Sequence, residues 1–202
     1  MKRRVMGCCA MLMMSTALLT GCGGAADSAK YVKGILDVAY GKSVDDYVEA
    51  ADVKEADAKK YSAQALESEA DALQAYFSMD LKGSDKTEKA MEEACKLLFD
   101  KVTYTVEEKD GKVIIKVKPV TALQSKAVQD YVDEYNIREF VDGDDSCTDE
   151  VFAQGLLDVL KSDGVEVADK ETEITISVGE KDGKPSVSDE DLAKIDEAAI
   201  VY

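Results

Sequence analysis

The sequence predicts an α+β fold, in which an antiparallel sheet of about four strands packs against several helices. Apolar residues recur at helical spacing along most of the chain. In two places the spacing switches to a period of two on either side of an Asp-Gly pair, which is typical of a β-hairpin. These hairpins, at residues 102–117 and 174–187, supply the strands, and helices are expected to cover the apolar face of the sheet.

The first 22 residues have the pattern of an export signal. Three cations at positions 2–4 precede fifteen uncharged residues, and small residues follow. This stretch is shorter than the roughly 20 apolar residues that a membrane-spanning helix needs. It ends in the sequence LTGC at residues 19–22, which resembles the lipobox of bacterial lipoproteins.

The lipobox resemblance implies that Cys22 carries a lipid. In that family, a diacylglyceryl group is attached to the cysteine thiol and the chain is cleaved between Gly21 and Cys22. Residues 1–21 are then a lipoprotein signal peptide, and residues 22–27 form a lipidated cysteine with a short tether. Two or three acyl chains anchor a protein stably. We therefore expect a lipid anchor on Cys22 that holds the protein on the extracytoplasmic face of the cell membrane.

The remaining residues, 28–202, are expected to form a single acidic domain. Removing the three signal cations from a net charge of −17 leaves −20 for residues 22–202. This charge excludes a nucleic-acid partner, which needs a cationic surface, and it opposes adhesion of the protein surface to anionic lipid. Residues 142–202 carry −13, whereas residues 22–60 carry only −2. We expect the near-neutral end to face the membrane.

Four helices are expected before the first hairpin. Their apolar stripes lie within residues 31–40, 44–48, 61–77 and 91–99. Gly41 ends the first helix, and Ser43 with Asp46 resembles a capping box at the start of the second. Asp52 with Glu55 marks the start of the third in the same way.

The first hairpin has a definite register. With a two-residue turn at Asp110-Gly111, Val106 faces Ile115 and Tyr104 faces Val117, so the apolar side chains share one side. Pro119 ends this hairpin. The expected elements after it are helices with stripes at 123–135 and 151–160, a strand at 174–178, a turn at Asp182-Gly183, a return strand that begins at Val187, and a last helix from Asp189.

The two hairpin sequences are similar. VTYTVEEKDGK at residues 102–112 and ITISVGEKDGK at residues 174–184 align without gaps. An internal duplication of a helix–hairpin unit would explain the similarity. Convergence would explain it equally, because Asp-Gly is a favoured hairpin turn and the helices that precede the two hairpins do not align.

Two segments resemble a known group of lipoproteins. YVKGILDVAYGKSVDDYVEAA at residues 31–51 is similar to the opening of small NTF2-like and related domains in Gram-positive lipoproteins. TEITISVGEKDGKPSVSDEDL at residues 172–192 resembles the closing hairpin and helix of an uncharacterised lipoprotein family of clostridia-like bacteria, although Pro185-Ser186 replaces an aromatic residue that is common there. The resemblance implies an α+β architecture at the cell envelope, without naming a substrate.

The residue types present argue against an enzyme. The chain has no histidine, which excludes Ser-His-Asp and Cys-His nucleophilic sites and zinc sites of the HExxH kind. The acidic clusters Asp45-Asp46 and 189–191 fall where helices are expected to begin, and acids stabilise helix N-termini. Chemistry based on carboxylate, lysine, tyrosine or cysteine side chains stays open. We assign no catalytic residue and no cofactor site.

Two cysteines and one acidic loop remain. Cys95 has core-like helical spacing, and its pairing with Cys147 in a disulfide is left open. The loop DGDDSCTDE at residues 142–150 offers oxygen ligands suited to calcium, but Cys147 and Ala153 stand where an EF-hand has glycine and glutamate. The alternative is a solvated loop in which Ser146 or Thr148 caps the next helix. We assign no metal site.

Two functions are compatible with these patterns. The first is a non-catalytic, surface-anchored interaction module that holds a protein partner at the cell envelope. The second is a small-ligand-binding domain with a pocket between helices and sheet. An exposed apolar patch would favour the first, and a closed pocket with convergent polar groups would favour the second. The sequence favours the first.

Overall fold

The computed structural model describes residues 28–80, 84–162, 164–181 and 184–202 and confirms the α+β class. The predicted signal peptide, Cys22 and the turn residues Asp182 and Gly183 lie outside the described residues. The elements are α1 (Ser28–Ala39), α2 (Asp45–Ala51), α3 (Glu55–Tyr76), α4 (Asp85–Lys101), β1 (Thr103–Lys109), β2 (Lys112–Lys118), η2 (Ala122–Gln124), α5 (Lys126–Asn136), η3 (Ile137–Val141), α6 (Asp149–Ser162), β3 (Thr172–Ile176), β4 (Gly179–Lys181), β5 (Lys184–Ser186) and α7 (Asp189–Ala199).

The first hairpin forms with the predicted register. Strands β1 and β2 pair antiparallel, with Val106 opposite Ile115 and Tyr104 opposite Val117. Asp110 and Gly111 both have positive φ, 53° and 73°. A two-residue turn of this kind matches the twist of the flanking strands. The apolar face of the hairpin is therefore set by the turn sequence together with the alternation.

The second hairpin differs from the expectation of one sheet of about four strands. The main sheet has three strands in the order β1-β2-β3, and β4 and β5 form a separate two-stranded sheet. Strand β3 ends at Ile176, and the return begins at Lys184 rather than at Val187. Gly179 and Pro185 lie within the paired strands of this second sheet. Proline has no amide hydrogen to donate to a further strand, which suits an edge position. The duplication stays a prediction.

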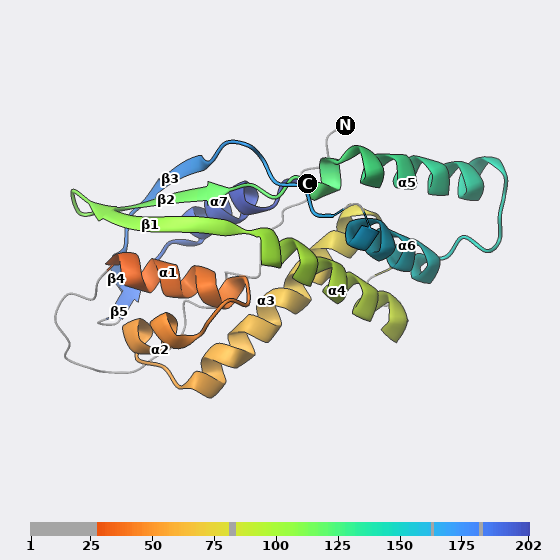
Figure 1. Ribbon diagram of the computed structural model, residues 1–202. Helices are drawn as coiled ribbons and strands as arrows, with labels where there is room; N and C mark the ends of the chain where they lie inside the picture. Colours follow the sequence, from red (N-terminus) through yellow and green to blue (C-terminus); the bar gives the residue numbers. More distant parts are fainter. Residues whose placement is uncertain (1–27, 81–83, 163, 182–183) are drawn as a thin grey trace.

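The helices lie on one face of the main sheet and then extend beyond it (Figure 1). Helices α1 and α7 pack against the face that carries the buried residues of β2 and β3, and α2 packs on α1. Helix α3 leads away from this layer to α4, which packs on α6, and α5 packs on α6 in turn. The molecule is elongated, with the sheet near one end and α5 and α6 at the other (Figure 1).

The helix predicted around residues 123–135 is divided at Ser125. A short 3-10 turn, η2, precedes this residue, and α5 begins after it. The Ser125 hydroxyl accepts a hydrogen bond from the Val128 amide at 3.3 Å, so it caps α5. Helix α5 then runs straight to η3, a π-helical turn in which the Asp142 amide donates to the Ile137 carbonyl at 3.1 Å.

Candidate functional site

The acidic clusters singled out in the sequence begin helices, as predicted. Asp45 and Asp46 start α2, and Asp189 starts α7. The Ser188 hydroxyl accepts from the Asp191 amide at 3.2 Å and caps α7. These carboxylates therefore stabilise helix N-termini.

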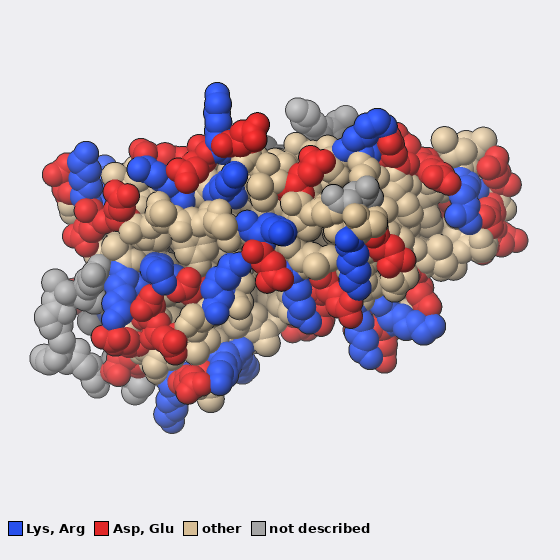
Figure 2. All heavy atoms as spheres, viewed as in Figure 1, with Lys and Arg blue, Asp and Glu red and all other residues tan. Residues whose placement is uncertain are grey.

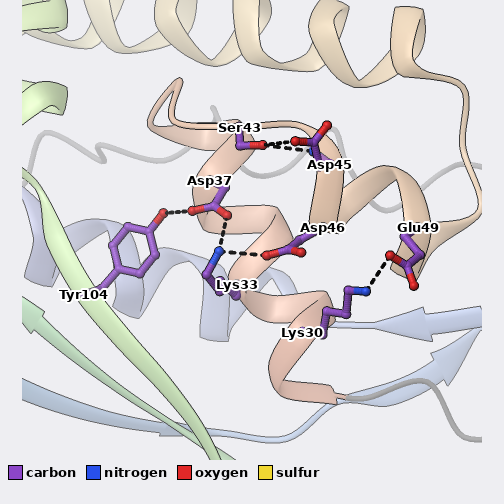
Figure 3. A network of polar contacts seen from close by, with 8 residues as sticks. All are labelled: Lys30, Lys33, Asp37, Ser43, Asp45, Asp46, Glu49 and Tyr104. Atoms are coloured by element: carbon purple, nitrogen blue, oxygen red, sulfur yellow. Dashed lines mark hydrogen bonds and ion pairs between the residues drawn. The ribbon is translucent and has the colours of Figure 1, made fainter.

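Asp46 does not complete the predicted capping box and instead joins a polar network between α1, α2 and β1 (Figure 3). The Lys33 ammonium donates to Asp37 at 2.6 Å and to Asp46 at 2.7 Å. The Tyr104 hydroxyl donates to the second oxygen of Asp37, also at 2.6 Å. The bond from Lys33 lowers the pKa of Asp46. Each Asp37 oxygen accepts a hydrogen bond, so the network joins α1, α2 and β1.

The loop at residues 142–150 is organised around its own side chains. Asp144 accepts hydrogen bonds from Ser146 and Arg138, both at 2.6 Å, and these bonds lower the pKa of Asp144 to about 2. Thr148 caps α6 by accepting from the Val151 amide at 3.3 Å, as one sequence alternative predicted. Within the described ranges, no three acidic, cysteine or histidine side chains are grouped to hold a metal.

The two cysteines of the described residues are unbonded. Cys95 is buried in the core, as its spacing predicted, and Cys147 is half-buried in the acidic loop. Burial raises the pKa of the Cys95 thiol well above its ordinary value, and the nearby Glu69 carboxylate adds to that shift. The thiol is therefore protonated and unreactive where it lies.

A buried acidic cluster lies between α3 and the C-terminal elements. Glu69 is 3% exposed, and one of its oxygens accepts a hydrogen bond from the Tyr202 hydroxyl. Burial raises the pKa of Glu69. Burial also raises the pKa of Asp196 on α7, and the Glu69 carboxylate raises it further. No lysine or arginine among the described residues forms a salt bridge with either group. Folding therefore increases the affinity of both carboxyls for a proton.

Large apolar side chains are exposed at the far end of α5. Phe140 is 76% exposed, Val141 75% and Ile137 53%; we call these three residues of η3 the apolar tip. Val151, at the start of α6, is 43% exposed, which differs from the sequence expectation that it lies on the apolar stripe of that helix. Folded proteins rarely expose large apolar side chains together unless they serve contact with another surface.

Two tyrosines fix α5, and with it the apolar tip, on α6. The hydroxyls of Tyr131 and Tyr135 donate to the carbonyls of Phe152 and Thr148, each at 2.9 Å. Their rings pack on the Phe152 ring at centroid distances of 5.5 and 5.0 Å. Gly155 makes room for this contact, because a Cβ atom there would lie 2.2 Å from the Tyr131 hydroxyl oxygen. Burial raises the pKa of both tyrosines to about 12, so the hydroxyls remain donors at neutral pH.

The loop that follows the apolar tip is held by backbone bonds as well as by Arg138. The Asp144 amide donates to the Arg138 carbonyl, and the Cys147 amide donates to the Asp144 carbonyl, both at 3.0 Å. The Arg138 guanidinium binds the Asp144 carboxylate from the other side. The apolar tip is therefore followed by a loop that these hydrogen bonds hold in place. The side chains of the tip are exposed to solvent.

Acidic residues flank the apolar tip on both sides in the sequence. Five of them form what we call the acidic rim, namely Asp133, Glu134, Glu139, Asp142 and Asp145. Figure 2 shows uncharged surface at the end formed by α5 and α6, with several acidic side chains and a basic one beside it. None of the five carboxylates forms a salt bridge within the part of the chain that the structure describes.

Sequence reasoning missed both the apolar tip and the buried acids. The segment IREFV has three large apolar residues in an acidic stretch just beyond the stripe of α5, and that position outside any periodic pattern is the signal that could have marked it. Glu69 gave no such signal, because the segment ESEAD at residues 67–71 has the composition of a solvent-exposed helix surface. Helix α3 buries Ala65 and Leu73 as predicted and packs Leu66 partly against the core. It also buries Glu69 and Gln74, which no sequence pattern predicted.

The fold is similar to that of a solved bacterial structure. No family model matches this chain, and no curated protein shows significant similarity to its sequence. A search of solved structures finds the crystal structure of a "putative lipoprotein (ycdA)" from Bacillus subtilis, with a TM-score of 0.62 and 17% sequence identity. The match covers 88% of this chain and 57% of that one. In the described residues, no helix is long and apolar enough to cross a membrane. The NTF2-like resemblance stays a prediction.

Proposed function

We propose that this protein is a membrane-anchored, surface-exposed lipoprotein that acts as a non-catalytic interaction module at the cell envelope. The exposed apolar tip carries this proposal. Exposed apolar side chains favour association, because burial against a partner removes their surface from water. The tip is at the end of the molecule remote from the sheet, where a partner can approach it (Figure 1).

The lipid anchor rests on different observations. The LTGC sequence at residues 19–22 resembles a lipobox, and the fold is similar to that of a lipoprotein structure. An acylated Cys22 would hold the domain at the membrane, while residues 133–150 carry the apolar tip with eight acidic residues and one cation. Anionic lipid repels such a surface, which leaves the tip for a protein partner. The small-ligand alternative stays a prediction without an observation that favours it.

Anchoring is tested by fractionating cells that produce the full chain. The wild-type protein is expected in the membrane fraction, and Cys22→Ala is expected to move it to the soluble fraction, because the substitution removes the acyl chains. A Cys22→Ala protein that stays in the membrane fraction would contradict the anchor. Both proteins keep Cys95 and Cys147, so a difference between them comes from the thiol of Cys22 alone.

The interaction is tested in the same cells by photo-cross-linking. A photo-reactive phenylalanine analogue is placed at position 140, and a control analogue is placed at position 108, an exposed site on β1 at the sheet end. A discrete protein adduct from position 140, absent from position 108, is expected. If neither position yields an adduct, the apolar tip has no partner in the envelope and the proposed function is wrong.

A further inference from the structure

We infer that the apolar tip and its acidic rim bind a basic, amphipathic protein segment, in which a large apolar side chain is flanked by lysine or arginine. This inference rests on the proposed function, since it names the chemistry of the partner at the same surface. Three features carry it: the composition of the tip, the unpaired charge of the rim, and the fixed shape of the loop.

The apolar tip provides the anchor point. Phe140 and Val141 are each about three-quarters exposed and adjacent in the chain, at 76% and 75%. Aromatic side chains dominate the energetics of interfaces, because each one buries a large area with few rotatable bonds. A partner side chain of similar size would cover these two residues and Ile137 together.

The acidic rim selects the sign of charge on the partner. The single cation of residues 133–150, Arg138, is already hydrogen-bonded to Asp144 at 2.6 and 3.1 Å. The five carboxylates of the rim form no salt bridge within the described residues. Opposite charges placed around an apolar centre steer association and fix its orientation. Lysine or arginine on both sides of the partner's apolar anchor would complement the rim.

The same charges disfavour the other occupants of an apolar patch. A second copy of this chain, packed tip to tip, would bring two acidic rims into contact, and like charges across an interface oppose association. An anionic lipid surface is disfavoured for the same reason. The fixed loop adds to the specificity, because a surface that is already ordered loses little conformational freedom on binding.

The test uses the full chain with Cys22→Ala, which removes the acyl chains and alters no described residue. The probe is a fluorescent amphipathic peptide of leucine and lysine, titrated by anisotropy at low and at physiological salt. A leucine–glutamate peptide of the same length and phosphatidylglycerol vesicles are the alternative probes. Sedimentation of the protein alone tests self-association.

Three paired variants locate the binding. Phe140→Ser with Val141→Ser removes the apolar anchor and is expected to weaken peptide binding at least about tenfold. Asp142→Asn with Asp145→Asn is expected to weaken it about threefold at low salt and to make it less salt-dependent. Glu108→Gln with Glu180→Gln makes the same change in net charge at the sheet end and is expected to leave affinity within about twofold.

The inference is overturned if the lysine peptide does not bind, or if the tip variant and the sheet-end control bind it equally. It is also overturned if the glutamate peptide or the vesicles bind as well as the lysine peptide does, or if the protein self-associates through Phe140. These failures are distinct from failure of the proposed function. A discrete adduct from position 140 alongside a negative peptide result leaves the module in place and makes the chemistry of its partner wrong.

Discussion

Glu69 and Phe140 break the usual rule of burial in opposite directions. The Glu69 carboxyl is 3% exposed inside the protein, whereas the Phe140 ring is 76% exposed at the end of α5. The buried acid has a partner within the chain, because the Tyr202 hydroxyl donates to it. The exposed ring lies beyond the tyrosine contacts that fix α5 on α6, next to the exposed Val141 and in an acidic stretch of the chain.

The two residues differ in where their unfavourable environment is compensated: Glu69 within its own chain, and Phe140 on contact with another molecule. A buried carboxyl is tolerated when a hydrogen bond and a bound proton remove the need for water. An exposed aromatic ring gains nothing from its own chain here, so its favourable burial is available to another molecule. The buried Glu69 therefore affects the stability of the fold, and the exposed Phe140 affects the binding of a partner.

The largest expected effect tests the support beneath the apolar tip. Phe152→Ala removes the ring on which Tyr131, Tyr135 and Phe77 pack, and it is expected to lower the free energy of unfolding by about 3–5 kcal/mol. Urea unfolding measures the change. The neighbouring variant Val151→Ala, at an exposed position, is the control and is expected within about 0.5 kcal/mol of wild type. An equal loss of unfolding free energy in Val151→Ala would show that this exposed position contributes as much to stability as the buried Phe152 ring.

The next effect tests the buried acid through pH. Burial raises the pKa of Glu69 above its unfolded value of 4.5, so the folded state binds the proton more tightly than the unfolded state does. Stability from this group is therefore present below pH 4.5 and is lost as pH rises through the raised folded pKa. Glu69→Gln keeps an acceptor for Tyr202 and is expected to lose less stability than the wild type does between pH 4 and pH 8.

Denaturant unfolding across this pH range measures the Glu69 effect. Glu67→Gln, two residues earlier on the exposed side of α3, is the matched control and is expected to leave the pH profile unchanged. A wild-type stability that rises steadily from pH 4 to pH 8 with the same slope in Glu69→Gln would show that the buried carboxyl is already ionised and compensated.

A smaller, local effect tests whether the loop after the apolar tip is fixed by its ion pair. Arg138→Gln removes the guanidinium that binds Asp144 and is expected to speed amide exchange at Asp144 and Cys147 several-fold. Global stability is expected to change little, because both side chains are at the surface. Hydrogen exchange read residue by residue measures the change. Unaltered exchange would mean that the backbone bonds alone hold this loop.

The smallest expected effect on folding comes from the apolar tip itself. Phe140→Ser with Val141→Ser is expected to change the free energy of unfolding by less than about 0.5 kcal/mol, because neither side chain is buried. Thermal unfolding measures this. A loss of several kcal/mol would mean that the ring packs within the protein in solution, and the contrast with Glu69 would disappear.

Much of the fold could be predicted from local patterns. The register of the first hairpin followed from the Asp-Gly turn and the alternation of Tyr104 and Val106, since both features act over a few residues. The second hairpin turns between Lys181 and Lys184, as predicted, but the expectation that it joins the main sheet was wrong. Alternation of apolar residues does not say which strand a segment pairs with. The pairing of β3 with β2, and of β4 with β5, depends on residues far apart in the chain.

The sequence by itself determined the acidic character, the absence of histidine, the helical and strand periods and the lipobox-like LTGC. Each is a property of composition or of neighbours in the chain. Only the tertiary structure decided that Glu69 is buried and that Ile137, Phe140 and Val141 are exposed. The physical reason is that burial is a relation between distant elements: Tyr202 closes over Glu69 from 133 residues away. The apolar tip, in contrast, lies where α5 extends past its last contact with α6.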